Sequence, residues 1–78
     1  MTLYVVKAAF DDEAGVWYVE HTDIPGLATE APTFDELRHK IEIVAPELLE
    51  ANEVETSPAE VAVEIIAHAT TKVSLSAA

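Results

Sequence analysis

Histidines and carboxylates are the side chains of this chain that could bind a metal ion, and the 3 histidines point to zinc. Imidazole is a common zinc ligand, and three imidazoles can form a catalytic zinc site. His21, His39 and His68 do not have the spacing of a metal-binding motif. We expect His39 on the polar side of a helix, His21 on the core side of one strand and His68 on the outer side of another. Because these are three different surfaces, the sequence predicts no metal site.

Residues for covalent or phosphate chemistry are equally scarce. The chain has no cysteine to act as a nucleophile or a redox group, and Gly15 and Gly26 are too few for a glycine-rich phosphate loop. A serine–histidine–aspartate site would have to take its serine from a polar segment, as Ser57, Ser74 or Ser76. We therefore expect no enzymatic activity and no cofactor.

The overall composition is that of a small acidic domain. A chain of 78 residues has a thin core, and without cysteine no disulfide reinforces it, so self-association is the expected support. The 15 acidic and 4 basic residues give a formal net charge of -11, which repels nucleic acid and anionic lipid. No signal peptide or membrane-spanning run is recognisable. We expect a cytoplasmic protein that contacts neither nucleic acid nor a membrane directly.

Two amphipathic strands joined by a hairpin loop begin the chain. In residues 2–10 Lys7 marks the side that faces water, so the inward side chains are Tyr4, Val6, Ala8 and Phe10. Residues 11–15 form a polar loop with a glycine late in it, as a hairpin requires. The second strand directs Glu20 outward, which assigns two side chains to the core, Trp17 and Val19.

The sequence D-I-P-G-L at residues 23–27 ends the second strand abruptly. Pro25 cannot donate a ladder hydrogen bond and Gly26 tolerates a positive φ, so the chain must turn here. Residues 27–31 are then long enough for one short edge strand. An edge strand exposes unpaired backbone groups, which are either guarded against aggregation or used to bind a partner strand.

A helix is the strongest periodic signal in the chain. Thr33 and Glu36 form a capping box that starts it. Its apolar residues follow a 3-4-3-4 spacing and make one stripe: Phe34, Leu37, Ile41, Val44 and Leu48. Pro46 removes one backbone hydrogen bond, so we expect a kink or a tightened last turn near Ala45. The helix should end by Ala51 or Asn52.

The remaining chain supplies one strand. After a polar connection at residues 52–58, alternate positions from 61 to 75 are apolar or small, which predicts one long strand. The fold class is therefore α+β, a two-layer structure with an antiparallel sheet in the order β-β-β-α-β and one helix on one face. The other sheet face is too apolar for a fully wetted surface, and we expect a homodimer or higher homo-oligomer to form through it. Its self-association residues are Leu3, Val5, Tyr18 and Ile66.

Several pieces of the chain resemble the HicB-type antitoxin domain, and most closely a small HicB-like family of single-domain proteins of unknown function. They are the strand pair around Gly15 and Trp17, the D-I-P-G-L turn, the T-F-D-E-L helix start and the segment A-P-E-L-L-E at residues 45–50. The resemblance covers roughly residues 3–70 of a single domain that we expect at residues 1–78. Many HicB antitoxins carry a C-terminal DNA-binding domain, and we expect none here.

The resemblance implies a degenerate RNase H-like fold and a non-catalytic role in protein binding. The typical HicB protein neutralises HicA, a small basic toxin that cleaves mRNA, and complementary charge speeds such an encounter. This chain is therefore expected to be an antitoxin of a toxin–antitoxin system, or an orphan relative with another partner. The expected partner-binding residues, in the edge strand and the acidic loops, are Asp11, Asp12, Glu13, Asp23, Leu27, Ala28, Thr29 and Glu30.

Two other functions are alternatives. RNase H-like nucleases hold Mg²⁺ with carboxylates that converge from neighbouring strands and a helix. Here the middle of the first strand has no carboxylate, and the acidic residues 11–13 and Asp23 belong to a hairpin loop and a turn, which favours solvated acidic loops. An oligomeric small-ligand binder is the other alternative, and it would need an apolar pocket between protomers.

Overall fold

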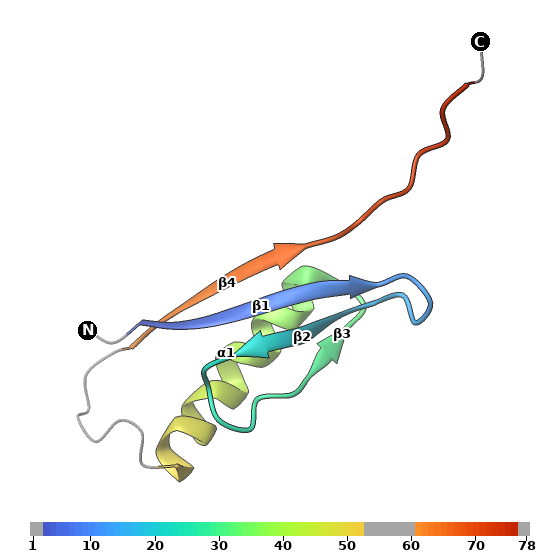
Figure 1. Cartoon of the computed structure of the whole chain (residues 1–78). Coiled ribbons are helices and arrows are strands. Elements are labelled where there is room, and N and C mark those ends of the chain that lie inside the picture. Colours follow the sequence, from blue (N-terminus) through green and yellow to red (C-terminus); the bar gives the residue numbers. More distant parts are fainter. Residues whose placement is uncertain (1–2, 53–60, 77–78) are drawn as a thin grey trace.

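The structure, a computed structural model, describes residues 3–52 and 61–76. One helix packs on one face of a four-stranded sheet (Figure 1). The elements follow the predicted order along the chain, which confirms the α+β class. They are β1 (Leu3–Asp11), β2 (Val16–Thr22), β3 (Glu30–Ala31), α1 (Phe34–Ala51) and β4 (Ala62–His68). The predicted polar connection lies outside the described residues from residue 53 onward.

The sheet is mixed, and the predicted all-antiparallel arrangement is wrong for its last strand. The strand order is β3-β2-β1-β4; β2 is antiparallel to both of its neighbours, whereas β4 is parallel to β1. Two reversals make β3 run in the direction of β1, and α1 then returns the chain to the end of the sheet where β1 starts. A strand that begins there must run parallel to β1, through a crossover connection.

A bulge in β2 reverses the expected placement of His21. Lys7 pairs with His21, and the next residue of β1, Ala8, pairs with Val19, so Glu20 is the extra residue of β2. One extra residue shifts the alternation of side chains along a strand. His21 is therefore exposed beside Lys7 on the sheet face away from α1, and its predicted core-side position is wrong. We call this side of the sheet the open face.

The helix confirms the predicted apolar stripe and adds two further buried residues to it. Leu37 and Ile41 are buried as expected, and Ala45 and Leu49 join them on the same side. The remaining stripe residues, which are partly buried against the core, are Phe34, Val44 and Leu48. The helix continues through Pro46 and ends at Ala51, with Asn52 as the C-cap, where the sequence places its end.

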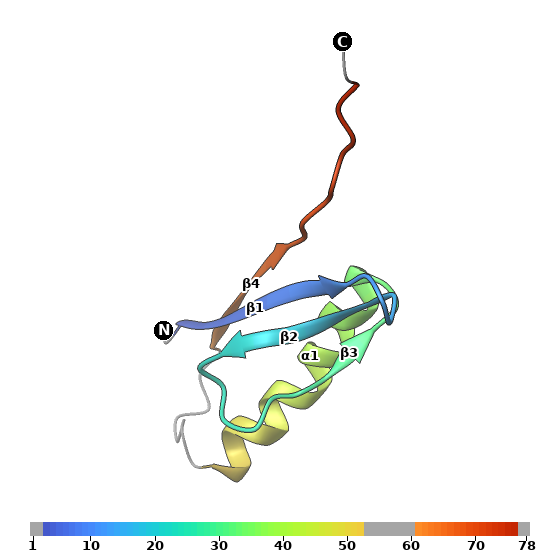
Figure 2. The ribbon, with the colours of Figure 1, turned by 45° about the vertical axis from the view of Figure 1, so that its right-hand side comes forward.

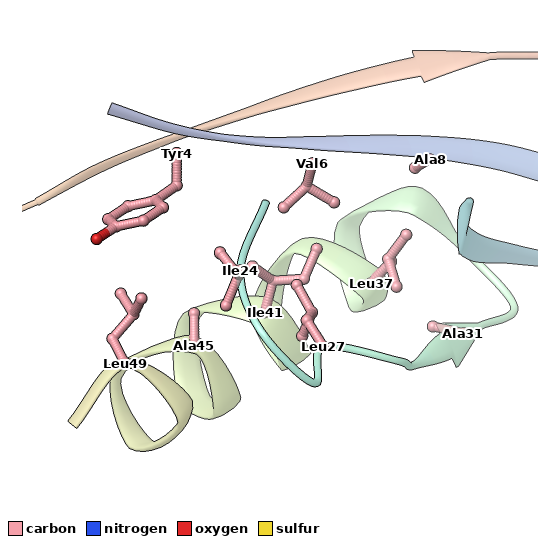
Figure 3. Packing of buried hydrophobic residues seen from close by; sticks show 10 residues of the cluster. All are labelled: Tyr4, Val6, Ala8, Ile24, Leu27, Ala31, Leu37, Ile41, Ala45 and Leu49. Atoms are coloured by element: carbon pink, nitrogen blue, oxygen red, sulfur yellow. The ribbon is translucent and has the colours of Figure 1, made fainter. Parts of the chain in front are cut away.

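The core lies between α1 and the facing side of the sheet (Figure 3). The predicted inward residues of β1 are confirmed, because Tyr4, Val6 and Ala8 are buried there and Phe10 is partly buried. The turn after β2 contributes Ile24 and Leu27, whose side chains lie beside Ile41 of α1 (Figure 3). The buried cluster comprises Tyr4, Val6, Ala8, Ile24, Leu27, Ala31, Leu37, Ile41, Ala45 and Leu49.

The last strand is shorter than predicted. Its pairing with β1 ends at His68, opposite Ala9, and β1 itself ends at Asp11, so the sheet offers no neighbour beyond that point. Residues 69–76 continue as an extended arm that leaves the sheet (Figure 2). The arm makes the chain elongated, with extents of 62 × 22 × 17 Å.

The helix cap provides the first testable prediction. The Thr33 hydroxyl accepts a hydrogen bond from the backbone N–H of Glu36 at 3.1 Å. Replacing Thr33 with alanine leaves that N–H without this acceptor, so we expect Thr33→Ala to lower the free energy of unfolding by about 1 kcal/mol. Urea denaturation measures the change. Thr33→Ser keeps the hydroxyl and should stay close to wild type; equal losses in both variants would show that the hydroxyl is not the cause.

Candidate functional site

Three aromatic rings meet at the hairpin end of the sheet, which the sequence did not indicate as a group. The rings of Phe10 and Trp17, on β1 and β2, lie 5.3 Å apart at 58°. The rings of Trp17 and Phe34, the first residue of α1, lie 5.7 Å apart at 71°. These are the tilted and edge-to-face arrangements that aromatic pairs prefer. We call these three residues the aromatic row; each is partly buried, so the row is packed on the core but still reaches the surface.

Carboxylates flank the aromatic row on two sides. Asp12 and Glu13 are exposed in the hairpin loop directly after β1, and Asp35 and Glu36 are exposed in the first turn of α1. The elements that carry them are joined by the contacts of Trp17 with its two ring neighbours. We call the four carboxylates the acidic rim. Asp35 also forms an exposed ion pair with Arg38 at 3.9 Å. Aromatic side chains bordered mainly by carboxylates are suited to binding a protein of the opposite charge.

The hairpin loop directs its two carboxylates of the acidic rim into solvent. The Asp11 carboxylate accepts hydrogen bonds from the backbone N–H groups of Glu13 and Ala14, at 2.9 and 3.2 Å. The Gly15 N–H donates to the Asp11 carbonyl at 2.7 Å, and Gly15 has a φ of 69°, which a residue without a side chain adopts easily. Asp11 is therefore occupied in shaping the loop, and Asp12 and Glu13 are left at its surface.

The D-I-P-G-L turn lies at the opposite end of β2 and is structural. Gly26 has a φ of 79° and the N–H of Leu27 donates to the carbonyl of Ile24 at 3.3 Å, as in a type II turn. The Asp23 carboxylate accepts a hydrogen bond from the Val5 N–H at 2.9 Å, which ties the turn to β1. Leu27 is buried in the core. Its side chain is therefore not available at the surface for the predicted contact with a partner.

The predicted edge strand at residues 27–31 is reduced to two residues, Glu30 and Ala31. Its outer edge is also covered in part, because the Lys40 ammonium donates a hydrogen bond to the Glu30 carbonyl at 2.7 Å. A side chain that reaches from a helix over an edge strand covers the edge and discourages pairing with another chain. A partner strand added here would have to displace Lys40.

The predicted partner-binding residues thus fall into two separate groups. Asp11, Asp12 and Glu13 lie at the hairpin end of the seven-residue β2, and Asp23 and Ala28 follow its other end. Thr29 and Glu30 run back along β2, where the Thr29 carbonyl accepts a hydrogen bond from the Val19 N–H at 3.2 Å. The aromatic row lies beside the hairpin group, and Glu30, which pairs with Tyr18, lies next to it on β3. A cross-strand pair of aromatic residues beside a hairpin loop was the sequence signal that could have found it.

The open face brings together the residues predicted for self-association. The strand register places Leu3 and Val5 of β1, Tyr18 of β2 and Ile66 of β4 on this one side of the sheet. Here a hydrogen bond of 2.8 Å joins the His68 Nε2 to a Glu20 carboxylate oxygen, across the central strand β1. His21 shares this face, whereas His39 is on the helix. Within residues 3–52 and 61–76, no three histidine or carboxylate side chains are grouped as metal ligands.

The helix also has no membrane-spanning character. In the part of the chain that the structure describes, no helix is both long and apolar enough to cross a bilayer.

Comparison with protein families assigns the chain to a family. A family model described as a domain of unknown function, DUF1902, matches residues 3–77, which is nearly the whole chain. The chain belongs to the DUF1902 family. No curated protein matches this DUF1902 chain.

A solved structure supports the same fold for the DUF1902 chain. It is the crystal structure of a hypothetical protein from the extremely thermophilic bacterium Thermus thermophilus. The two chains are 44% identical and superpose with a TM-score of 0.62, over 91% of this chain and 99% of the other.

Proposed function

We propose that this DUF1902 chain is a cytoplasmic, non-catalytic protein-binding module of the HicB-like antitoxin type, which blocks a small basic mRNA-cleaving toxin of the HicA type. The observation that carries the proposal is the aromatic row with its acidic rim. Aromatic side chains supply most of the binding energy in many protein interfaces. Carboxylates around them attract a basic partner and orient it before contact.

The chemistry of the acidic residues supports binding rather than catalysis. Asp11 and Asp23 accept hydrogen bonds from backbone N–H groups and so stabilise the loops that contain them. Asp12, Glu13 and Glu36 extend into solvent, where a carboxylate is available for a lysine or arginine of a partner. A toxin that binds RNA through basic side chains would present such groups, and occupying them would exclude RNA.

Affinity capture followed by an activity assay tests the proposal. The tagged chain should retain a small basic protein from its native cells at low salt and release it as salt rises. The purified partner should cleave mRNA, and an equimolar amount of the chain should stop the cleavage. Binding should also change the fluorescence of Trp17, the single tryptophan of the chain, because it lies within the aromatic row.

Two matched variants locate the binding site. Asp12→Lys/Glu13→Lys reverses half of the acidic rim and should weaken binding at least about tenfold. Glu47→Lys/Glu50→Lys makes the same change of charge on exposed residues near the other end of α1 and should bind nearly as wild type. A captured partner that does not cleave RNA would contradict the antitoxin function. Equal losses in both variants would show that overall charge, and not the rim, determines binding.

A further inference from the structure

The C-terminal arm, residues 69–76, is an extended segment without a neighbouring strand in the described part of the chain. No hydrogen bond or ion pair among the described residues involves it. Val73 and Leu75 in the arm are 76% and 89% exposed, the highest values for large apolar side chains among the described residues. An extended segment that holds such side chains away from its own core is suited to packing on another surface.

The outer edge of β4 offers such a surface. β4 is the terminal strand of the sheet on its side, so the backbone groups of its outer edge have no strand to pair with among the described residues. α1 packs against β2 and β3, which leaves the helix-facing side of β4 partly uncovered. A groove of about 370 Å³ lies between α1 and β4. Arg38 and Glu42 of α1 also line it, and its apolar lining comprises Ile41, Ala45, Pro46, Leu49, Val61, Val63 and Ile65.

We propose that two copies of this chain exchange their arms: residues 69–76 of each copy pair antiparallel with β4 of the other and insert Val73 and Leu75 into its groove. The arm directly continues β4, so one two-fold axis places each arm along the outer edge of the partner's β4. Both arms and both grooves are then occupied, which closes the assembly as a dimer. Added backbone hydrogen bonds give affinity and the alternate side chains give specificity, as in other cases of strand addition. This assembly is independent of the antitoxin proposal.

The side-chain alternation of the strand agrees with this pairing. Val61, Val63 and Ile65 face the groove, and side chains at every second position of a strand share one face. A straight continuation of β4 therefore puts Val73 and Leu75 on the same helix-facing side. A two-fold axis perpendicular to the sheet keeps that side unchanged in the second copy, so both apolar side chains arrive above the partner's groove.

Charge selects the register of the pairing. When His68 of one copy lies opposite His68 of the other, Val73 of one copy lies opposite Val63 of the other. Leu75 then lies opposite Val61 of the other copy. In the same register Lys72 lies opposite Glu64 of the second copy, on the open face. Opposite charges that face each other across a strand pair are stabilising. The chain has a net charge of -11, so two copies repel each other unless their few cations meet carboxylates, as they do twice here.

The position of His68 is compatible with the two-fold axis. Its imidazole is hydrogen bonded to Glu20 on β2, at 2.8 Å, which directs the ring across β1 and away from the outer edge of β4. The neighbouring residues that face each other on the groove side are Ala67 and Ala69, which are small. No bulky side chain therefore blocks the approach of the two strands at the axis.

Charge reversal tests the register by sedimentation analysis of the full chain. Wild type should be a dimer, and Lys72→Glu or Glu64→Lys alone should weaken dimerisation at least about tenfold, because each creates two like-charged pairs. The combined variant restores opposite charges and should return to within about threefold of wild type. Lys7→Glu, the same change of charge on the central strand, should remain dimeric. A monomeric wild type, or a combined variant no better than the single ones, would overturn the proposal.

Disulfide trapping gives an independent answer, because the chain has no cysteine of its own. In the proposed register Ala62 faces Ser74 of the second copy, so a mixture of Ala62→Cys and Ser74→Cys should oxidise to a mixed dimer. Ala62→Cys mixed with Thr70→Cys should not. If Leu3→Asp dissociates the dimer while Lys72→Glu leaves it intact, the open face is the interface and arm exchange is wrong.

Discussion

Ile24→Ala is expected to lower the free energy of unfolding by about 2–5 kcal/mol, the usual cost of truncating a large buried side chain to alanine. Ile24 is 1% exposed and belongs to the buried cluster, where it lies beside Ile41 of the helix (Figure 3). It is held there by the turn, whose Ile24 N–H donates to the Thr22 hydroxyl at 3.1 Å. A domain of this length has a total stability of roughly 4–12 kcal/mol, so the variant should lose a large part of it.

Urea denaturation, followed by the fluorescence of Trp17 at one fixed protein concentration, measures this loss. Ile24→Val removes a single methylene and should cost only about 0.5–1.5 kcal/mol. Comparing the stability losses of Ile24→Ala and Ile24→Val separates the effect of the cavity from a disturbance of the turn. A loss below about 1 kcal/mol for Ile24→Ala would show that the D-I-P-G-L turn is a surface loop and not part of the core.

Ile41→Ala should be as severe as Ile24→Ala, with a loss of about 2–5 kcal/mol. Ile41 is 2% exposed at the centre of the buried side of α1. Ile43 provides a matched control, because it is the same residue type on the same helix and is 54% exposed. Ile43→Ala should change the free energy of unfolding by no more than about 0.5 kcal/mol.

The comparison of these two variants by urea denaturation removes helix propensity from the result, because both make the same substitution in the interior of α1. The difference between them therefore reports burial alone. If the two variants lose equal stability, α1 does not present Ile41 to the sheet, and the placement of the helix is wrong.

Much of the fold follows from local patterns. The alternation of Tyr4, Val6 and Ala8 and the helical stripe through Leu37 and Ile41 identify their buried sides, because each period matches one backbone geometry. The helix starts at Phe34, after the Thr33 cap, because the groups that set this boundary lie within one turn of it. Sequence alone therefore predicts these elements and their faces well.

The candidate site was predicted less well, because it depends on residues that are distant in the chain. Asp12 and Glu13 were expected to bind a partner together with Asp23, but the length of β2 separates them. The aromatic row joins the hairpin instead to the start of α1, through the edge-to-face contact of Trp17 with Phe34. No local pattern contains that contact.

The sequence by itself determined the element order, the buried faces, the turn at Pro25 and Gly26 and the acidic charge, since each depends on neighbouring residues or on composition. The tertiary structure decided the parallel pairing of β4 with β1, the bulge at Glu20 that turns His21 outward and the departure of the arm from the sheet. These features depend on which strands meet and where their pairing ends. That choice is made by packing between segments far apart in the chain, and no periodicity within one segment encodes it.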